Sequence, residues 1–83
     1  MKYSLTKHAA DVLEGREIPL VRLEQVLAAH QRVETDPDDV ALEHRLGRIA
    51  EHVDRVLRVV VNKTVRPVRV VTPYFDRTMR NKL

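Results

Sequence analysis

The sequence predicts a single α+β domain in which two N-terminal helices pack on a three- or four-stranded antiparallel sheet. Apolar residues at helical spacing occupy the first thirty positions, and runs of β-branched residues occupy the last third. A chain of 83 residues suits one domain, covering residues 1–83. Because only three residues are Phe or Tyr and none is Trp, the core is expected to consist mainly of Val and Leu.

Two helices are expected in the first thirty residues, after a short lead-in at 2–5 that also suits a strand. Thr6 can cap the start of the first helix, and Gly15 can occupy the position after its end. Pro19 suits the first turn of the second helix, where a missing N–H costs little. The apolar stripe of the second helix consists of Leu20, Leu23, Val26 and Leu27, followed by His30.

Residues 40–53 fit two patterns. A helix would align Leu42, Leu46, Ile49 and Val53 on one face, whereas a strand would alternate Val40, Leu42, His44 and Leu46. Gly47 disfavours a helix by ~1 kcal/mol relative to Ala. The pattern by itself slightly favours the helix.

The last third predicts a β-hairpin, with strands at 56–62 and 68–75 joined by residues 63–67. If Asn62 pairs with Val68, then Arg58 lies opposite Thr72. Alternation then gives a polar face made of Arg58, Asn62, Thr72 and Tyr74. The other face is apolar and is expected to receive the helices; it consists of Leu57, Val59, Val61, Val71 and Phe75.

Charge is divided unevenly along the chain. Residues 55–83 contain eight Lys or Arg and one acid, a formal charge of +7, whereas residues 1–54 contain seven bases and eleven acids, a charge of −4. The last eight residues, 76–83, form a basic tail. A basic hairpin on an acidic domain indicates a surface for a polyanion, either nucleic acid or an acidic protein partner.

Composition also limits the cellular location of the protein and the cofactors that it can bind. There is no cysteine, so disulfides and thiolate metal sites are excluded, and a cytoplasmic location is expected. No apolar run approaches the ~18–20 residues of a membrane span, so no membrane association is expected. The four histidines are separated by 22, 14 and 8 residues, which matches no standard metal motif. We therefore expect neither a metal nor another cofactor.

Several segments together resemble a small bacterial family of unknown function over nearly the whole chain. They are Tyr3-Ser4-Leu5-Thr6-Lys7-His8-Ala9, Asp36-Pro37-Asp38-Asp39, Arg55-Val56-Leu57-Arg58-Val59-Val60, Arg69-Val70-Val71-Thr72 and Tyr74-Phe75-Asp76-Arg77. This pattern is similar to RelE-like and BrnT-like toxins, within the wider group of microbial ribonuclease folds. The resemblance implies a strand at 40–53, metal-independent RNA cleavage and a cognate antitoxin protein.

Metal-free RNA cleavage requires a base for the 2′-hydroxyl, an acid for the leaving oxygen and cations beside the phosphate. The candidate catalytic residues are His8, His44, Arg58 and Tyr74. The candidate RNA-binding residues are Asn62, Lys63, Arg66, Thr72, Arg77 and Arg80. Arg58 stands among valines, so its guanidinium must either face a ligand or pair with an acid such as Asp76.

A second hypothesis is a non-catalytic binding module of the same fold. Its basic hairpin would bind nucleic acid or an acidic protein partner without cleavage. An exposed edge strand in so small a domain also makes a homodimer through β-pairing a reasonable expectation.

Overall fold

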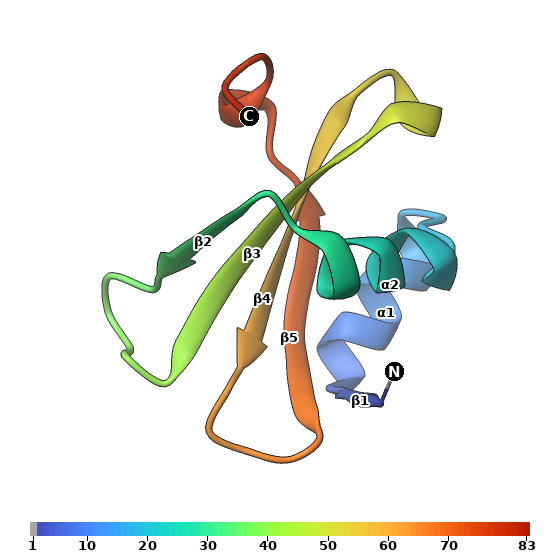
Figure 1. Ribbon diagram of the computed structural model, residues 1–83. Coiled ribbons are helices and arrows are strands. Elements are labelled where there is room, and N and C mark those ends of the chain that lie inside the picture. Colours follow the sequence, from blue (N-terminus) through green and yellow to red (C-terminus); the bar gives the residue numbers. More distant parts are fainter. Residues whose placement is uncertain (1) are drawn as a thin grey trace.

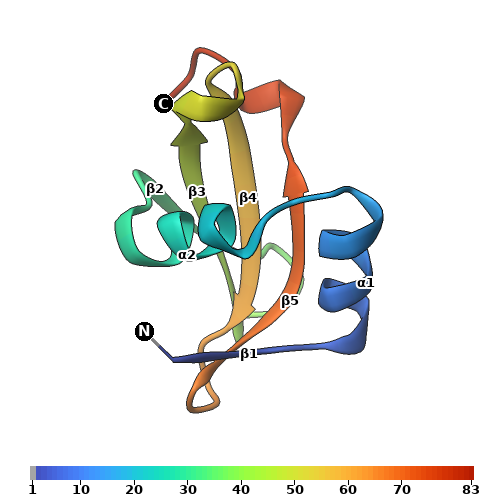
Figure 2. The ribbon, with the colours of Figure 1, turned by 90° about the vertical axis from the view of Figure 1, so that its right-hand side faces the viewer.

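The computed structural model describes residues 2–83, which form a five-stranded sheet with two helices on one face (Figure 1). In chain order the elements are β1 (Tyr3–Leu5), α1 (Lys7–Gly15), α2 (Leu20–Ala29), β2 (Arg32–Thr35), β3 (Leu42–Ile49), η1 (Ala50–His52), β4 (Arg55–Asn62), β5 (Val68–Phe75) and η2 (Arg77–Met79). The strand order across the sheet is β1-β5-β4-β3-β2. Helix α1 lies beside β5, and α2 lies across β3 and β4 (Figure 2).

The α+β class is as predicted, but the sheet is not. The predicted three- or four-stranded, RelE/BrnT-like antiparallel sheet is wrong in strand number and in strand direction. Strand β1 pairs parallel to β5, with Tyr3 opposite Val68, and β2 adds a fifth, antiparallel strand beside β3. Strands of three and four residues are too short to produce a readable alternation, so the sequence pattern gives them little signal.

Residues 42–49 form strand β3, so the weak helical preference of this segment was wrong and the strand implied by the resemblance is confirmed. Leu42 and Leu46 satisfy both periodicities, which is why the pattern misled. Gly47 decides the packing here. A Cβ at this position would lie 3.0 Å from Cγ2 of Val26, so any larger residue would require Val26 or α2 to shift away from β3.

The predicted helix ends agree with the structure to within about a residue. The hydroxyl of Thr6 accepts a hydrogen bond from the amide of Ala9 at 3.0 Å, which caps α1. Pro19 occupies the N-cap position of α2. At the other end of α2, Nδ1 of His30 bonds the carbonyl oxygen of Val26 at 3.0 Å. His30, which follows the apolar stripe, therefore closes the end of this helix.

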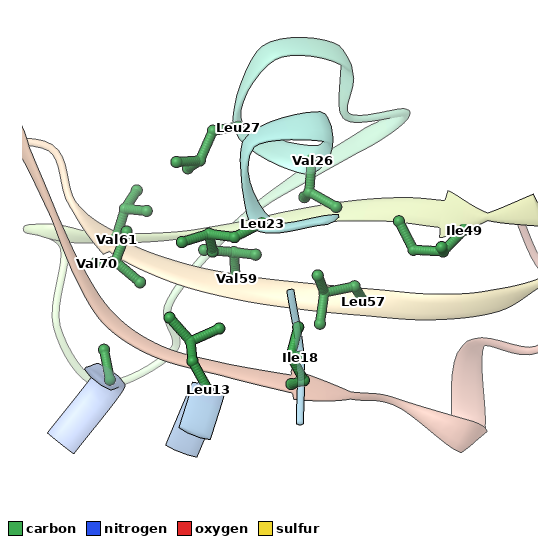
Figure 3. Close-up of a cluster of buried hydrophobic side chains, with 11 residues drawn as sticks. Leu13, Ile18, Leu23, Val26, Leu27, Ile49, Leu57, Val59, Val61 and Val70 are labelled. Carbon is green, nitrogen blue, oxygen red and sulfur yellow. The ribbon is translucent and has the colours of Figure 1, made fainter. Parts of the chain in front are cut away.

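The main core lies between the helices and the sheet (Figure 3). Leu13, Ile18, Leu23, Val26 and Leu27 come from the helical side, and Ile49, Leu57, Val59, Val61 and Val70 come from the sheet. The predicted apolar positions of β4 are confirmed. On β5 the buried valine is Val70 rather than Val71, because a bulge between Val60 and Val61 shifts the pairing there.

The hairpin register differs from the prediction by two residues from Leu57 to Val60 and by one residue beyond the bulge, where Asn62 pairs with Arg69. Arg58 lies opposite Tyr74, and Val60 lies opposite Thr72. Because side chains alternate with a period of two, this shift leaves Arg58, Thr72 and Tyr74 on the same face, as predicted. We call this face, which is opposite the helices, the open face.

The basic tail is not a loose end but packs on one end of the open face. Met79 of η2 is buried there against Leu46 and Val56, with Leu83 beside them. Asp76 caps η2 by accepting the amide of Thr78 at 3.0 Å. Figure 2 shows this segment at the same end of the sheet as η1, where the chain turns from β3 to β4.

Candidate functional site

Most polar side chains of the open face belong to two rows of residues that cross the strands. Adjacent strands are about 4.8 Å apart, so neighbours within a row can touch. From β5 to β2, the first row is Thr72, Val60, His44 and Glu34. The second row is Tyr74, Arg58, Leu46 and Arg32. The rows bring three predicted catalytic residues, His44, Arg58 and Tyr74, to neighbouring positions.

A hydrogen-bonded group of charged residues surrounds Arg58, which is only 9% exposed. Nε of Arg58 donates to Oδ2 of Asp76 at 2.8 Å, and Nη1 donates to Oε1 of Glu34 at 3.0 Å. Nη1 also contacts Nδ1 of His44 at 2.8 Å, and Nε2 of His44 lies 2.7 Å from Oδ1 of Asp36. We call these five residues the Arg58 network.

The network fixes the tautomer of His44. Arg58 can only donate, so Nδ1 of His44 accepts and the ring proton lies on Nε2, from which it is donated to Asp36. Both ring nitrogens are therefore occupied. In this arrangement His44 orients Arg58 and has no nitrogen left for a substrate.

The two aspartates of the network are held in their charged forms. Hydrogen bonds from His44, and then from the amides of Asp38 and Asp39, keep the pKa of Asp36 below its ordinary value. Burial raises the pKa of Asp76, but hydrogen bonds from Thr78 and Arg58 outweigh it and the pKa is lowered. For Arg58, burial lowers the pKa. Its hydrogen bonds to Glu34 and Asp76 outweigh burial, so the net effect is a raised pKa.

One donor group of Arg58 remains available. Within residues 2–83, Nη2 has no protein acceptor, whereas Nε and Nη1 are occupied. Since no buried side-chain nitrogen or oxygen in the described part of the chain lacks a partner, Nη2 must keep contact with solvent. Its guanidinium is thus held through Nε and Nη1 and keeps one NH₂ group without a protein acceptor, on the residue that lies opposite Tyr74 in the sheet.

His8 is brought to the edge of this surface by α1. Its Nε2 lies 3.2 Å from the hydroxyl of Thr72, and the ring is exposed in the first turn of the helix. Thr72 and His44 lie two strands apart, about 10 Å. The structure therefore brings His8 to Thr72, two residues before Tyr74 on β5, but it does not bring His8 to the Arg58 network.

The predicted RNA-binding residues separate into two groups. Asn62, Lys63 and Arg66 lie at the hairpin turn, where Oδ1 of Asn62 accepts the amide of Thr64 at 2.9 Å and shapes the turn. Lys63 and Arg66 line a hollow of about 660 Å³. Thr72, Arg77 and Arg80 lie toward the other end of β5, which is eight residues or about 25 Å long.

At this other end lies a pocket of about 460 Å³ between the end of α1, η1 and β5. Its charged and aromatic lining includes Arg16, His52, Arg55, Tyr74, Phe75 and Arg77. A neighbouring hollow of about 320 Å³ shares Arg55, Phe75 and Arg77 and adds Arg80. We call the two hollows together the basic cleft. Among the residues that the structure describes, none of its four arginines forms a salt bridge or a side-chain hydrogen bond.

Three of the Arg and His residues that line the basic cleft were not candidate site residues in the sequence. Arg16 ends a helix and His52 belongs to a connecting turn, so neither falls in the basic hairpin. Arg55 entered the sequence analysis through the charge count and as the first residue of a segment that carries the resemblance, but not as a site residue. Their meeting depends on how α1 and η1 flank β5, and no local pattern encodes that.

A comparison with protein-family models assigns the chain to a family. A family model described as "Domain of unknown function (DUF4258)" matches residues 5–75. The chain belongs to this family. The DUF4258 range contains four of the five network residues and ends just before Asp76. Membership confirms the predicted small family of unknown function, and it lends no support to a RelE or BrnT relationship.

No curated protein and no solved structure matches the chain. Neither helix formed by residues 2–83 has the length and apolar character that a membrane crossing requires. In the same part of the chain, no three His, Asp or Glu side chains are grouped so that they could hold a metal ion.

Proposed function

We propose that the protein is a metal-independent endoribonuclease acting at the Tyr74 end of β5, and that it is the toxin of a toxin–antitoxin pair. The position of Tyr74 carries this proposal. Its side chain is 43% exposed, lies opposite Arg58 in the sheet and lines the basic cleft. A proton donor thus lies where a fixed guanidinium and a group of unpaired arginines meet.

The chemistry can be assigned to residues around this point. His8 takes the proton of the ribose 2′-hydroxyl, and the 2′-oxygen attacks the adjacent phosphorus. Tyr74 gives a proton to the 5′-oxygen as its bond to phosphorus breaks, leaving a 2′,3′-cyclic phosphate and a 5′-hydroxyl. Arg77, together with Nη2 of Arg58, stabilises the charge on the phosphate oxygens. Because the nucleophile belongs to the RNA, this reaction requires no bound metal.

His44 and Asp36 support this site through Arg58. His44 has both nitrogens occupied, so we give it a positioning role in place of a direct proton transfer. Asp76 holds Arg58 and also caps η2, which begins at Arg77. The network thereby joins the guanidinium on the open face to the arginine of the cleft.

The test is cleavage of end-labelled RNA by the purified protein in EDTA, with and without ribosomes. Tyr74→Phe and His8→Ala are expected to lower the rate by ~10²–10⁴-fold each, because each removes a positioned acid or base. Arg69→Ala is the matched control, since Arg69 is exposed near the hairpin turn and away from the cleft. Absence of cleavage with every substrate would overturn the proposal.

The toxin role has its own test. Expression of the protein is expected to arrest bacterial growth, and co-expression of a short neighbouring open reading frame, the antitoxin, is expected to restore it. Tyr74→Phe should arrest growth far less at equal protein level. If expression of the active protein leaves bacterial growth unaffected, the toxin role is refuted.

A non-catalytic binding module is the second candidate, and the charge balance of the Arg58 network favours it. The network contains one arginine and three carboxylates: Arg58 pairs with Glu34 and Asp76, and the carboxylate of Asp36 contacts His44. Excess negative charge repels a phosphate and leaves binding to the basic cleft alone. Salt-dependent RNA binding without cleavage in the same assay would support this function.

A further inference from the structure

The basic cleft contains an aromatic pair. The rings of His52 and Phe75 are stacked, with centroids 4.8 Å apart and planes inclined by 23°. Phe75 is half-buried against the main core, whereas His52 is exposed. One face of the imidazole is therefore backed by Phe75, and the other is open to a second planar group.

The turn that carries His52 is held in a costly conformation. Val53 and Asp54 both have positive φ, 57° and 55°. For a β-branched residue such as Val53 this backbone conformation is a genuine outlier and is energetically unfavourable. Strain of this kind persists where the surrounding structure imposes it, and it concentrates at functional sites. Glu51, beside His52, lies 3.6 Å from Arg22 of α2, an ion pair that connects the turn to the helix.

Charge around the aromatic pair is positive. Arg16, Arg55 and Arg77 line the same pocket as His52, and no residue lining that pocket is acidic. The adjoining hollow contains one acid, Asp76, whose carboxylate is already engaged by Arg58 and Thr78. Free guanidinium groups beside an aromatic surface suit a phosphodiester that carries a stacked base.

We infer that His52, backed by Phe75, is a stacking platform for an unpaired nucleobase of single-stranded nucleic acid, whose phosphates lie on Arg55, Arg16 and Arg77. A base can lie on the imidazole only after it leaves its own stack, so duplexes are excluded. This names the substrate class of the proposed ribonuclease. It rests on the proposed function for the choice of RNA, and binding itself does not require cleavage.

The experiment measures binding by fluorescence anisotropy. The probe is a labelled octamer of 2′-O-methyl RNA, which cannot be cleaved through its 2′-position. Parallel arms use the same sequence as DNA, as a duplex, and with central abasic sites. We expect single strands to bind at least tenfold more tightly than duplexes or abasic strands. Tighter binding of the RNA form identifies RNA, and equal binding of DNA identifies single strands in general as the ligand; both outcomes support the platform.

Two pairs of variants separate stacking from charge. His52→Ala is expected to weaken binding about tenfold, whereas His52→Phe keeps a stacking surface and should bind nearly as well as the natural protein. Arg55→Ala should weaken every strand uniformly and reduce the slope of log affinity against log salt by about one. Arg69→Ala, an exposed arginine outside the cleft, should change neither quantity. Thermal melting of each variant reports that it is folded.

Three results would overturn the inference. They are equal affinity for abasic and intact strands, unchanged binding by His52→Ala, and equal competition by polyglutamate, which would indicate a surface for acidic peptides. Base-dependent binding without any RNA cleavage would refute the ribonuclease proposal and would still support the stacking platform. If the binding of His52→Ala is unchanged and its cleavage is unchanged too, the stacking platform is refuted and the ribonuclease proposal stands.

Discussion

Arg58 and Asp76 lie eighteen positions apart in the sequence and are joined by a contact of 2.8 Å between Nε and Oδ2. The side chains are each 11% exposed, so the pair is largely removed from water. Because Asp76 also caps η2, this contact attaches the C-terminal segment to the middle of β4. Arg58 therefore has a structural role whatever its part in catalysis.

Removing Arg58 should destabilise the fold. In Arg58→Ala, Asp76 and Glu34 lose a cation while remaining partly buried, and we expect the free energy of unfolding to fall by about 3 kcal/mol. Urea denaturation followed by circular dichroism measures this. The matched variant Arg69→Ala removes an exposed arginine with no salt bridge among the described residues and should change stability by less than about 0.5 kcal/mol. Equal effects of the two substitutions would show that the Arg58 network contributes no stability.

Stability should depend on acid pH. The pKa values of Asp36 and Asp76 are lowered from an ordinary value of 3.8, so the folded state holds their charged forms. Their contribution is fully present above that value and is lost as the pH falls through the lower folded values. Urea midpoints at pH 7 and pH 3 should differ more for the natural protein than for Asp76→Asn. An identical pH dependence in both would contradict the role of Asp76.

The two glycines should respond in opposite ways to alanine. Gly47→Ala places a methyl group 3.0 Å from Cγ2 of Val26 and should cost about 1–2 kcal/mol as α2 is pushed from β3. Gly15 ends α1, and a Cβ there meets nothing within 4 Å. Gly15→Ala should therefore be neutral or should stabilise by up to about 1 kcal/mol. Thermal melting of the two variants compares them directly, and a Gly47→Ala protein as stable as the natural one would refute the close packing.

Relieving the turn at Val53 should stabilise the protein. Val53 is 70% exposed, so its side chain contributes little packing, and asparagine adopts its positive φ at lower cost. Val53→Asn is expected to gain about 1 kcal/mol, or a rise of about 4–8 °C in the melting temperature. A lower melting temperature would mean that the turn is not strained.

Long elements with a single clear periodicity were predictable. The helices at 7–15 and 20–29 and the hairpin of β4 and β5 follow local patterns and caps, and they lie close to where they were expected. Strand β2 and the parallel pairing of β1 were not predicted, because three or four residues carry too little pattern. The bulge at Val60 and Val61 was equally invisible, since alternation fixes the face of a strand but not its register.

The candidate site was likewise predictable only where its residues follow a local sequence pattern. The amino-acid sequence by itself determined that Arg58, Thr72 and Tyr74 share a polar face, because strand alternation has a period of two residues. It also determined that the hairpin and tail are basic. Tertiary structure alone decided that Arg58 is held by Glu34, His44 and Asp76, and that Arg16 and His52 join Arg55 in one cleft. These contacts connect segments from five or more different elements, and such meetings depend on packing and strand order rather than on any local sequence pattern.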